Sequence, residues 1–265
     1  MSRAWRTLTT LVAFGSFGAG GIVLWLLVFP SLHLLVPDAR RRQPIARSLV
    51  QRLFRLFVAW MRLLGLLTYQ IQGKERLNRQ GLLILANHPT LIDVVFLIAM
   101  VRNADCVVRS GLSANLATRG AVRATGYISN IQGGELIQSC VRSLRGGGNL
   151  VIFPEGTRTR LGEPLRLQRG AAQIALRANT NITPVTIRCE PAGLMKGQPW
   201  WQVASQRLHF TICVEEDIAI APFAAGSGGQ TAVAARRLTE YLTEYFSKKR
   251  GWDASVRTRD QATAD

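Results

Sequence analysis

Lysine and acidic residues are scarce in this sequence of 265 residues. Only four lysines occur, so arginine supplies most of the 33 basic side chains, which face 16 acidic ones. The formal net charge at pH 7 is therefore +17. So positive a balance predicts an anionic partner, either nucleic acid or an acidic membrane surface. The alternative is a genome-wide bias toward arginine.

Charge is absent from residues 8–36, and this absence favours a membrane over a nucleic acid. The run exceeds the about 20 apolar residues that cross a bilayer. It is too long for a cleaved signal peptide, and no A-x-A-like cleavage site follows it. Arginines stand on both sides, so the positive-inside rule does not fix an orientation. A true span and a re-entrant pair in one leaflet both remain open, beside a buried soluble hairpin.

A second apolar pattern follows Pro37 and Pro44. Over residues 45–67 leucines and aromatic residues recur at helical spacing, while Arg52, Arg55 and Arg62 fall on another face. This pattern predicts an amphipathic helix lying at a membrane interface. We therefore expect residues 1–65 to form a membrane-embedded helical pair.

Cysteine is also rare, with four residues and no C-x-x-C spacing. Small buried thiols explain them better than disulfides or a zinc site do. A reducing cytoplasm is then the default compartment. We also find no metal-ligand cluster and no cofactor-binding loop, and expect neither a metal nor a cofactor. Together with the apolar segment, this predicts a domain on the cytoplasmic side of the inner membrane.

From about residue 66 the pattern alternates between strands and helices. Such alternation predicts an α/β fold, a central sheet flanked by helices, over residues 66–250. The polar residues 251–265 are expected to form a disordered tail. The strand-like runs are Leu66–Gln72, Leu82–Ala86, Cys106–Arg109, Asn149–Phe153, Ile182–Arg188 and Leu208–Val214, and the helix-like runs are 91–102, 113–124, 134–145, 169–178 and 230–249.

The stretch Asn87–Asp93 places a histidine at a strand-to-helix junction. Pro89 suits the first turn of the following helix, because that position needs no backbone N–H. Residues five apart do not share a helix face, so His88 must lie before the helix for Asp93 to reach it. A carboxylate on one ring nitrogen frees the other to accept a proton from an alcohol. A capping histidine with an incidental aspartate is the alternative for this stretch alone.

The stretch Phe153–Arg158 ends a predicted strand with a proline and a glycine. Gly156 permits a sharp turn, after which Thr157 and Arg158 follow Glu155 closely. Backbone N–H groups and a guanidinium in such a turn suit a phosphate or carboxylate. An ordinary turn with solvated charges is the alternative.

These two stretches, in this order and spacing, resemble the glycerolipid acyltransferase superfamily, the lysophosphatidate-acyltransferase-like enzymes. Asn-His-Pro-Thr-Leu-Ile-Asp is similar to the H-x4-D block, and Phe-Pro-Glu-Gly-Thr-Arg to a second hallmark. Ile182-Thr183-Pro184-Val185 resembles a further block. The resemblance covers roughly residues 66–215.

The resemblance implies a role for each matching residue. His88 would be the general base toward the acceptor hydroxyl, and Asp93 would orient it. The acyl group would come from a thioester on coenzyme A or acyl carrier protein, with no other cofactor. The residues implied in binding the acceptor head group are Glu155, Gly156, Thr157 and Arg158, with Pro184 shaping the site. The implied activity is membrane-bound O-acyl transfer to a lysophospholipid such as 1-acyl-glycerol-3-phosphate.

One block departs from the family pattern. Residues 126–130 read Gly-Tyr-Ile-Ser-Asn and lack the arginine that the family pattern carries there. Arg109, Arg119 or Arg123 could take its place, although each is equally typical of a solvated helix end. The departure leaves room for a different lysolipid acceptor in a specialised or secondary-metabolite pathway, or for a non-catalytic lipid-binding homologue. Nucleic-acid binding rests on charge alone, and we do not expect it.

Overall fold

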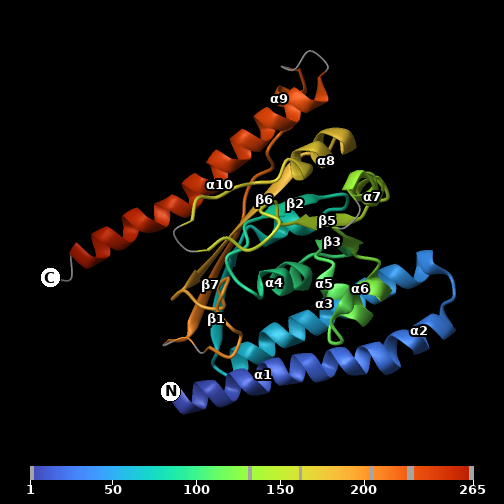
Figure 1. Cartoon of the computed structure of the whole chain (residues 1–265), viewed down its shortest axis with the longest axis vertical. Helices are drawn as coiled ribbons and strands as arrows, with labels where there is room; N and C mark the ends of the chain where they lie inside the picture. The colour runs from blue at the N-terminus through green and yellow to red at the C-terminus, as the bar shows by residue number, and fades with distance from the viewer. Residues whose placement is uncertain are drawn as a thin grey trace.

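A seven-stranded sheet forms the centre of the molecule in a computed structural model (Figure 1). The structure describes residues 3–130, 133–160, 163–202, 204, 206–225 and 230–262. The strand order is β1-β7-β6-β2-β5-β3-β4, and neighbours are parallel except for β6 and β7. The strands are β1 (Leu67–Gln72), β2 (Leu83–Ala86), β3 (Ala104–Val108), β4 (Ile128–Ser129), β5 (Asn149–Ile152), β6 (Ile182–Glu190) and β7 (Leu208–Val214).

The predicted α/β class is confirmed, and the six predicted strands differ from the observed ones by at most two residues at an end. The missed strand is β4, which has only two residues. So short a segment carries no readable alternation of polar and apolar positions.

Helices cover both faces of the sheet (Figure 1). Side chains of α3, α4 and α6 join the core on one face, with the N-terminal helices outside them, while α7, α8 and α10 cover the other face. The helices are α1 (Arg3–Val23), the π-helical turn η1 (Leu24–Val28), α2 (Phe29–Leu35), α3 (Ala39–Leu63), the 3-10 turn η2 (Lys74–Leu77), α4 (Asp93–Met100), α5 (Gly111–Ala114), α6 (Arg119–Thr125), α7 (Gly133–Arg145), α8 (Gly170–Ala178), α9 (Ala221–Ala225) and α10 (Thr231–Ala262).

The central strand β2 shows why the sheet needs both layers. All four of its residues are fully buried. Ile84 and Ala86 belong to the core on the α3 side, and Leu83 and Leu85 to the core on the α8 side. Successive side chains point to opposite faces of a strand, so an unbroken apolar run requires cover on both.

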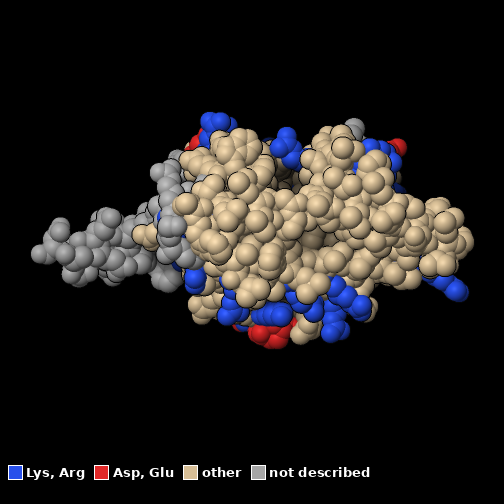
Figure 2. Space-filling model, turned by 90° about the horizontal axis from the view of Figure 1, so that it is seen from below, with Lys and Arg blue, Asp and Glu red and all other residues tan. Residues whose placement is uncertain are grey.

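The apolar N-terminal segment lies alongside α3 on the outside of the domain (Figure 1). Residues Ala4–Leu35 contain an 18-residue stretch with a mean hydropathy of 2.1 and are long and apolar enough to cross a membrane. Figure 2 views this side and shows a broad surface free of charged side chains, with Lys and Arg gathered along its edges. The exposed apolar residues of the segment include Leu8, Leu11, Leu26, Leu27, Leu34 and Leu35.

Glycines bring this segment into close contact with the domain. A Cβ at Gly21 would collide with the backbone carbonyl of Ala117. A Cβ at Gly120 would lie 2.7 Å from the Cα of Trp25. The Arg119 guanidinium covers the Trp25 ring, with its Cζ 4.4 Å from the ring centroid. The segment is therefore fitted to the domain by backbone contact.

The helix α3 begins earlier than predicted. It starts at Ala39, where the Asp38 side chain caps it by accepting the Arg40 N–H at 2.9 Å. The prediction of a start after Pro44 was wrong, because a proline near the helix start removes only one hydrogen bond while the Asp38 cap supplies another. Pro44 is accommodated inside the helix.

A buried ion pair fastens α3 to the sheet. The Arg47 guanidinium lies 2.9 Å from the Asp105 carboxylate of β3, and both side chains are at most 10% exposed. Arg47 Nε also donates to the Thr125 carbonyl, and Ser143 Oγ donates to Asp105 at 2.7 Å. Burial raises the pKa of Asp105, an effect that the Arg47 charge opposes. Helices from both faces of the sheet thus meet at one carboxylate.

The C-terminal helix continues further than predicted. It runs to Ala262, where we predicted an end near residue 249 and a disordered tail. Residues 251–262 contain no proline, and the single Gly251 costs a helix only about 1 kcal/mol. Residues 263–265 lie outside the described residues.

The fit of the N-terminal segment can be tested with neighbouring glycines. We expect Gly21→Ala to destabilise the fold by about 1–3 kcal/mol, because the new methyl group overpacks against Ala117. Gly20→Ala is the matched control, since a Cβ at that position would have no other atom within 4 Å. It should be neutral or stabilise the helix by about 0.5–1 kcal/mol. Thermal unfolding midpoints in detergent compare the two, and equal midpoints would contradict the close contact.

Candidate active site

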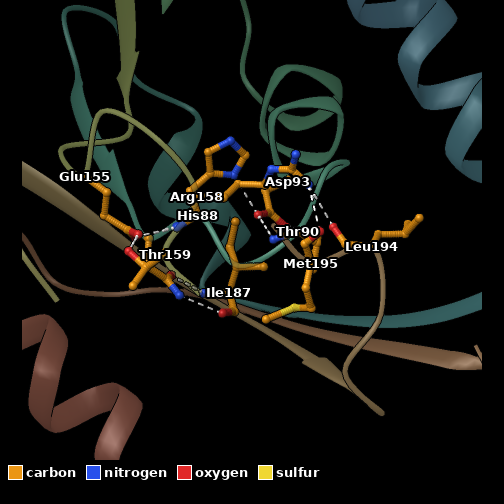
Figure 3. Close-up of polar contacts among 10 residues, drawn as sticks. His88, Thr90, Asp93, Glu155, Arg158, Thr159, Ile187, Leu194 and Met195 are labelled. Atoms are coloured by element: carbon orange, nitrogen blue, oxygen red, sulfur yellow. Dashed lines mark hydrogen bonds and ion pairs between the residues drawn. The ribbon is translucent and has the colours of Figure 1, made fainter. Parts of the chain in front are cut away.

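His88 lies just beyond the end of β2, at the carboxyl edge of the parallel strands. Its Nδ1 is 2.9 Å from Oδ2 of Asp93, the first residue of α4 (Figure 3). The carboxylate makes Nδ1 the protonated nitrogen, which leaves the Nε2 lone pair as a proton acceptor. The His88 side chain is 18% exposed, and Nε2 has no hydrogen bond among the described residues. The structure thus brings the two predicted residues together in a partly exposed site.

Asp93 is completely buried and is held by Thr90. The Thr90 N–H donates to Oδ2 at 2.6 Å, and Thr90 Oγ1 donates to Oδ1 at 2.5 Å. Residues between His88 and Asp93 form a turn, so the helix starts only at the aspartate. This turn explains how side chains five residues apart can meet.

The Phe153 ring stacks on the His88 ring at 4.2 Å between centroids. The two planes are inclined by 27°, so the contact is close to parallel. Phe153 follows the end of β5, the neighbour of β2. This stacking restricts the rotation of the imidazole about its side-chain bonds.

Glu155 is turned toward the main chain of His88. Its Oε1 accepts the His88 N–H at 2.8 Å, and its Oε2 accepts the hydroxyl of Thr159. The residue is only 7% exposed. Gly156 follows at φ +70°, and its N–H closes the turn onto the Phe153 carbonyl at 3.0 Å. Glu155 was predicted to bind the acceptor head group, but both of its carboxylate oxygens already accept hydrogen bonds from within the protein.

Arg158 lies on the other side of the site. Its Nη1 donates to the carbonyls of Leu194 and Met195 at 3.1 and 3.2 Å. Burial lowers the pKa of Arg158, the Asp93 charge opposes that shift, and the Arg109 charge adds to it. Arg109 follows β3 at the same sheet edge and is exposed. Arg158 therefore lies close enough to interact electrostatically both with Asp93 and with Arg109.

The remaining predicted residues lie in different surroundings. Thr157 is half-buried between Gly156 and Arg158. Pro184 is buried within β6 opposite Leu85, inside the sheet. Arg123 is exposed on α6, which packs against α3 and the N-terminal helices. Arg109 thus lies at the same edge of the sheet as His88, whereas Arg123 lies on a helix away from that edge.

Sequence reasoning missed two residues that shape the site. The Asn87 side chain accepts the Ile187 N–H at 2.7 Å and donates to the Ile187 carbonyl at 2.9 Å. Thr90 holds Asp93 as described above. An amide directly after a strand and a hydroxyl three residues before a helical aspartate are the signals that could have found them.

Among the described residues, no three His, Cys, Asp or Glu side chains are grouped so that they could hold a metal ion. The four cysteines are free, and burial raises the pKa of Cys189, which follows the strand segment that Asn87 contacts, to about 12. A thiol of this kind is protonated at neutral pH and is a poor nucleophile. Of these two side chains, His88 is the better suited to accept a proton.

Comparisons with known proteins agree with this geometry. Residues 68–188 match the family model described as Acyltransferase. Residues 68–188 therefore form a segment of the acyltransferase family that this model describes. This match includes the His88–Asp93 pair, Phe153–Arg158 and Pro184, and it confirms the superfamily that the sequence motifs indicated.

One solved structure and one related sequence are also similar to this chain. Its fold resembles the crystal structure of the 1-acyl-sn-glycerophosphate (LPA) acyltransferase PlsC from Thermotoga maritima, with a TM-score of 0.70 and 18% identity. That match covers 96% of this chain and 97% of the other. A 1-acyl-sn-glycerol-3-phosphate acyltransferase of Borreliella burgdorferi is 40% identical over 47 residues. The latter match spans 18% of this chain and 19% of that relative.

The hydroxyl of Thr90 provides a stability test of the site. We expect Thr90→Val to lower the free energy of unfolding by about 1–3 kcal/mol, because a buried carboxylate oxygen loses its donor. Thr68→Val is the control, since Thr68 bonds to His209 at the surface and should change stability by less than about 0.5 kcal/mol. Denaturant unfolding measures both. A Thr90→Val variant as stable as the control would show that the hydroxyl does not hold Asp93.

Proposed function

We propose that this chain is a membrane-bound O-acyltransferase that moves an acyl group from a thioester to the hydroxyl of a lysophospholipid. The observation that carries the proposal is the His88–Asp93 pair with a free Nε2 at the sheet edge. Both named relatives are acyltransferases for 1-acyl-glycerol-3-phosphate. Coenzyme A or acyl carrier protein would present the thioester, with no further cofactor.

The chemistry follows from the two residues. Nε2 of His88 takes the proton of the acceptor hydroxyl as its oxygen attacks the thioester carbonyl. Asp93 stabilises the imidazolium that forms and keeps Nδ1 protonated. The tetrahedral intermediate then expels the thiolate, which receives the proton back from Nε2. A thioester is already activated, so positioning and proton transfer suffice without a covalent acyl-enzyme.

Two arginines suit the anionic head of the acceptor. Arg158 uses only Nη1 in its bonds to Leu194 and Met195, and its Nε and Nη2 make no hydrogen bond among the described residues. Arg109 is exposed at the end of the adjacent β3 and acts electrostatically on Arg158. We infer that together they replace the arginine absent from residues 126–130. The absence of that arginine also favours testing lysolipids other than lysophosphatidate.

The N-terminal helices support membrane association in the plane of one leaflet. Phe14 packs on Trp200 at 5.3 Å and Trp25 on Arg119, so the domain contacts the apolar segment at several points along its length. A helix crossing the bilayer in this arrangement would pull the domain into the hydrocarbon. The re-entrant alternative keeps the charged edges in water and the apolar surface in lipid. We propose the cytoplasmic side of the inner membrane as its location.

Removing the base tests the reaction. We expect His88→Ala to reduce acyl transfer by about 10³-fold or more, because the imidazole that would take the hydroxyl proton is lost. His209→Ala is the control, since His209 lies exposed on β7.

The assay uses labelled acyl-CoA and acyl carrier protein with lysophosphatidate and other lysolipids. Both variants should pellet with membranes as the wild type does. Retained turnover in His88→Ala would reject the assigned base, and no turnover of any lysolipid by wild type would favour a non-catalytic homologue.

Removing the exposed arginine tests the acceptor site. We expect Arg109→Ala to raise the acceptor KM about tenfold, because a charged hydrogen bond to an anion is lost. The donor KM should stay unchanged. Arg123→Ala, which removes an equally exposed guanidinium on α6, should leave both KM values unchanged. An Arg109→Ala effect confined to the thioester donor would contradict the head-group role.

A further inference from the structure

The main chain at His88 is held from both neighbouring strands. The strand β2 lies between β6 and β5, and its regular pairing ends at Leu85 with β5 and at Ala86 with β6. On the β6 side, the Asn87 amide bonds to both the N–H and the carbonyl of Ile187. On the β5 side, the Glu155 carboxylate bonds to the His88 N–H. Beyond the last backbone pair, hydrogen bonds made by the Asn87 and Glu155 side chains therefore take over the connection of β2 to its two neighbouring strands.

The surroundings of Glu155 argue against direct contact with substrate. The residue is 7% exposed, and each carboxylate oxygen already accepts a hydrogen bond, one from His88 N and one from Thr159 Oγ1. The imidazole ring of His88 points away from this carboxylate (Figure 3). A head group near Nε2 would thus have the His88 residue itself between it and Glu155.

We propose that Glu155 is a positioning residue that acts on His88 through the backbone N–H and does not bind the acceptor. This proposal rests on the proposed role of His88 as the base. The carboxylate fixes the peptide from which the imidazole projects, Asn87 fixes the preceding residue, and Phe153 fixes the ring plane. A displacement of about 1 Å in such a group can reduce the rate by about 10²-fold.

Glutamine and alanine substitutions separate positioning from substrate binding. In Glu155→Gln the amide oxygen can accept the His88 N–H, and the amide nitrogen can donate to Thr159 Oγ1. We therefore expect a kcat within about fivefold of wild type and unchanged KM values, whereas Glu155→Ala should lose about 10²-fold in kcat with the acceptor KM unchanged. Glu216→Gln, a 90% exposed side chain beyond β7, is the matched control and should resemble wild type.

A second measurement does not depend on activity. Hydrogen exchange of the His88 amide should be slow in wild type and in Glu155→Gln, and fast in Glu155→Ala, because only the alanine variant lacks an acceptor. If Glu155→Ala does not fold, Glu155→Gln decides by its kinetics and its amide protection together.

Three results would overturn the proposal. The first is a Glu155→Gln variant whose acceptor KM rises about tenfold or more, as loss of a substrate-binding charge would cause. The second is a Glu155→Gln variant that loses kcat while its His88 amide stays protected. The third is an unprotected His88 amide in wild type. Failure of the proposed function is seen separately, because turnover by His88→Ala rejects the base while the amide protection at His88 stands.

Discussion

A fully buried carboxylate organises this site. An ionised group removed from water is strongly destabilising unless donors surround it, and Asp93 receives donors from Thr90 and His88. Its place at the first residue of α4 adds the favourable field of a helix N-terminus. The same carboxylate sets where α4 begins, which ring nitrogen of His88 is protonated, and which one is left as a proton acceptor. Local structure, packing and proposed chemistry meet in this one group.

The wider fold keeps that carboxylate in place from both sides of the sheet. The loop after β6 is tied to the turn before α4 by the Leu91 N–H bond to the Leu194 carbonyl, and to the loop after β5 by Arg158. On the far side of β5, the Arg47–Asp105 pair joins α3 to β3. Each tie satisfies a polar group that burial would otherwise leave unpaired. The N-terminal helices and the proposed catalytic edge therefore belong to one packed body.

Much of this arrangement could be predicted from the sequence, and the failures have physical causes. Continuous apolar runs such as Leu82–Ala86 predicted the buried strands, because a strand covered on both faces has no polar positions. The His88–Asp93 contact followed from spacing and a proline. The role of Glu155 could not follow, because its partner is the backbone N–H of His88. Such contacts depend on strand neighbours that are distant in sequence and leave no residue pattern.

The close fit of the N-terminal segment has a consequence for how the chain is made. Residues 4–35 are synthesised before the rest of the domain, yet their contacts at Ala117, Gly120 and Trp200 are made by segments that emerge much later. At about 5–20 residues per second, the delay before Trp200 appears is on the order of ten seconds. During that interval Phe14, Gly21 and Trp25 lack the partners that they have in the folded chain, and a lipid bilayer can cover this apolar segment instead. The domain would then assemble on a helix that is already bound to the lipid bilayer.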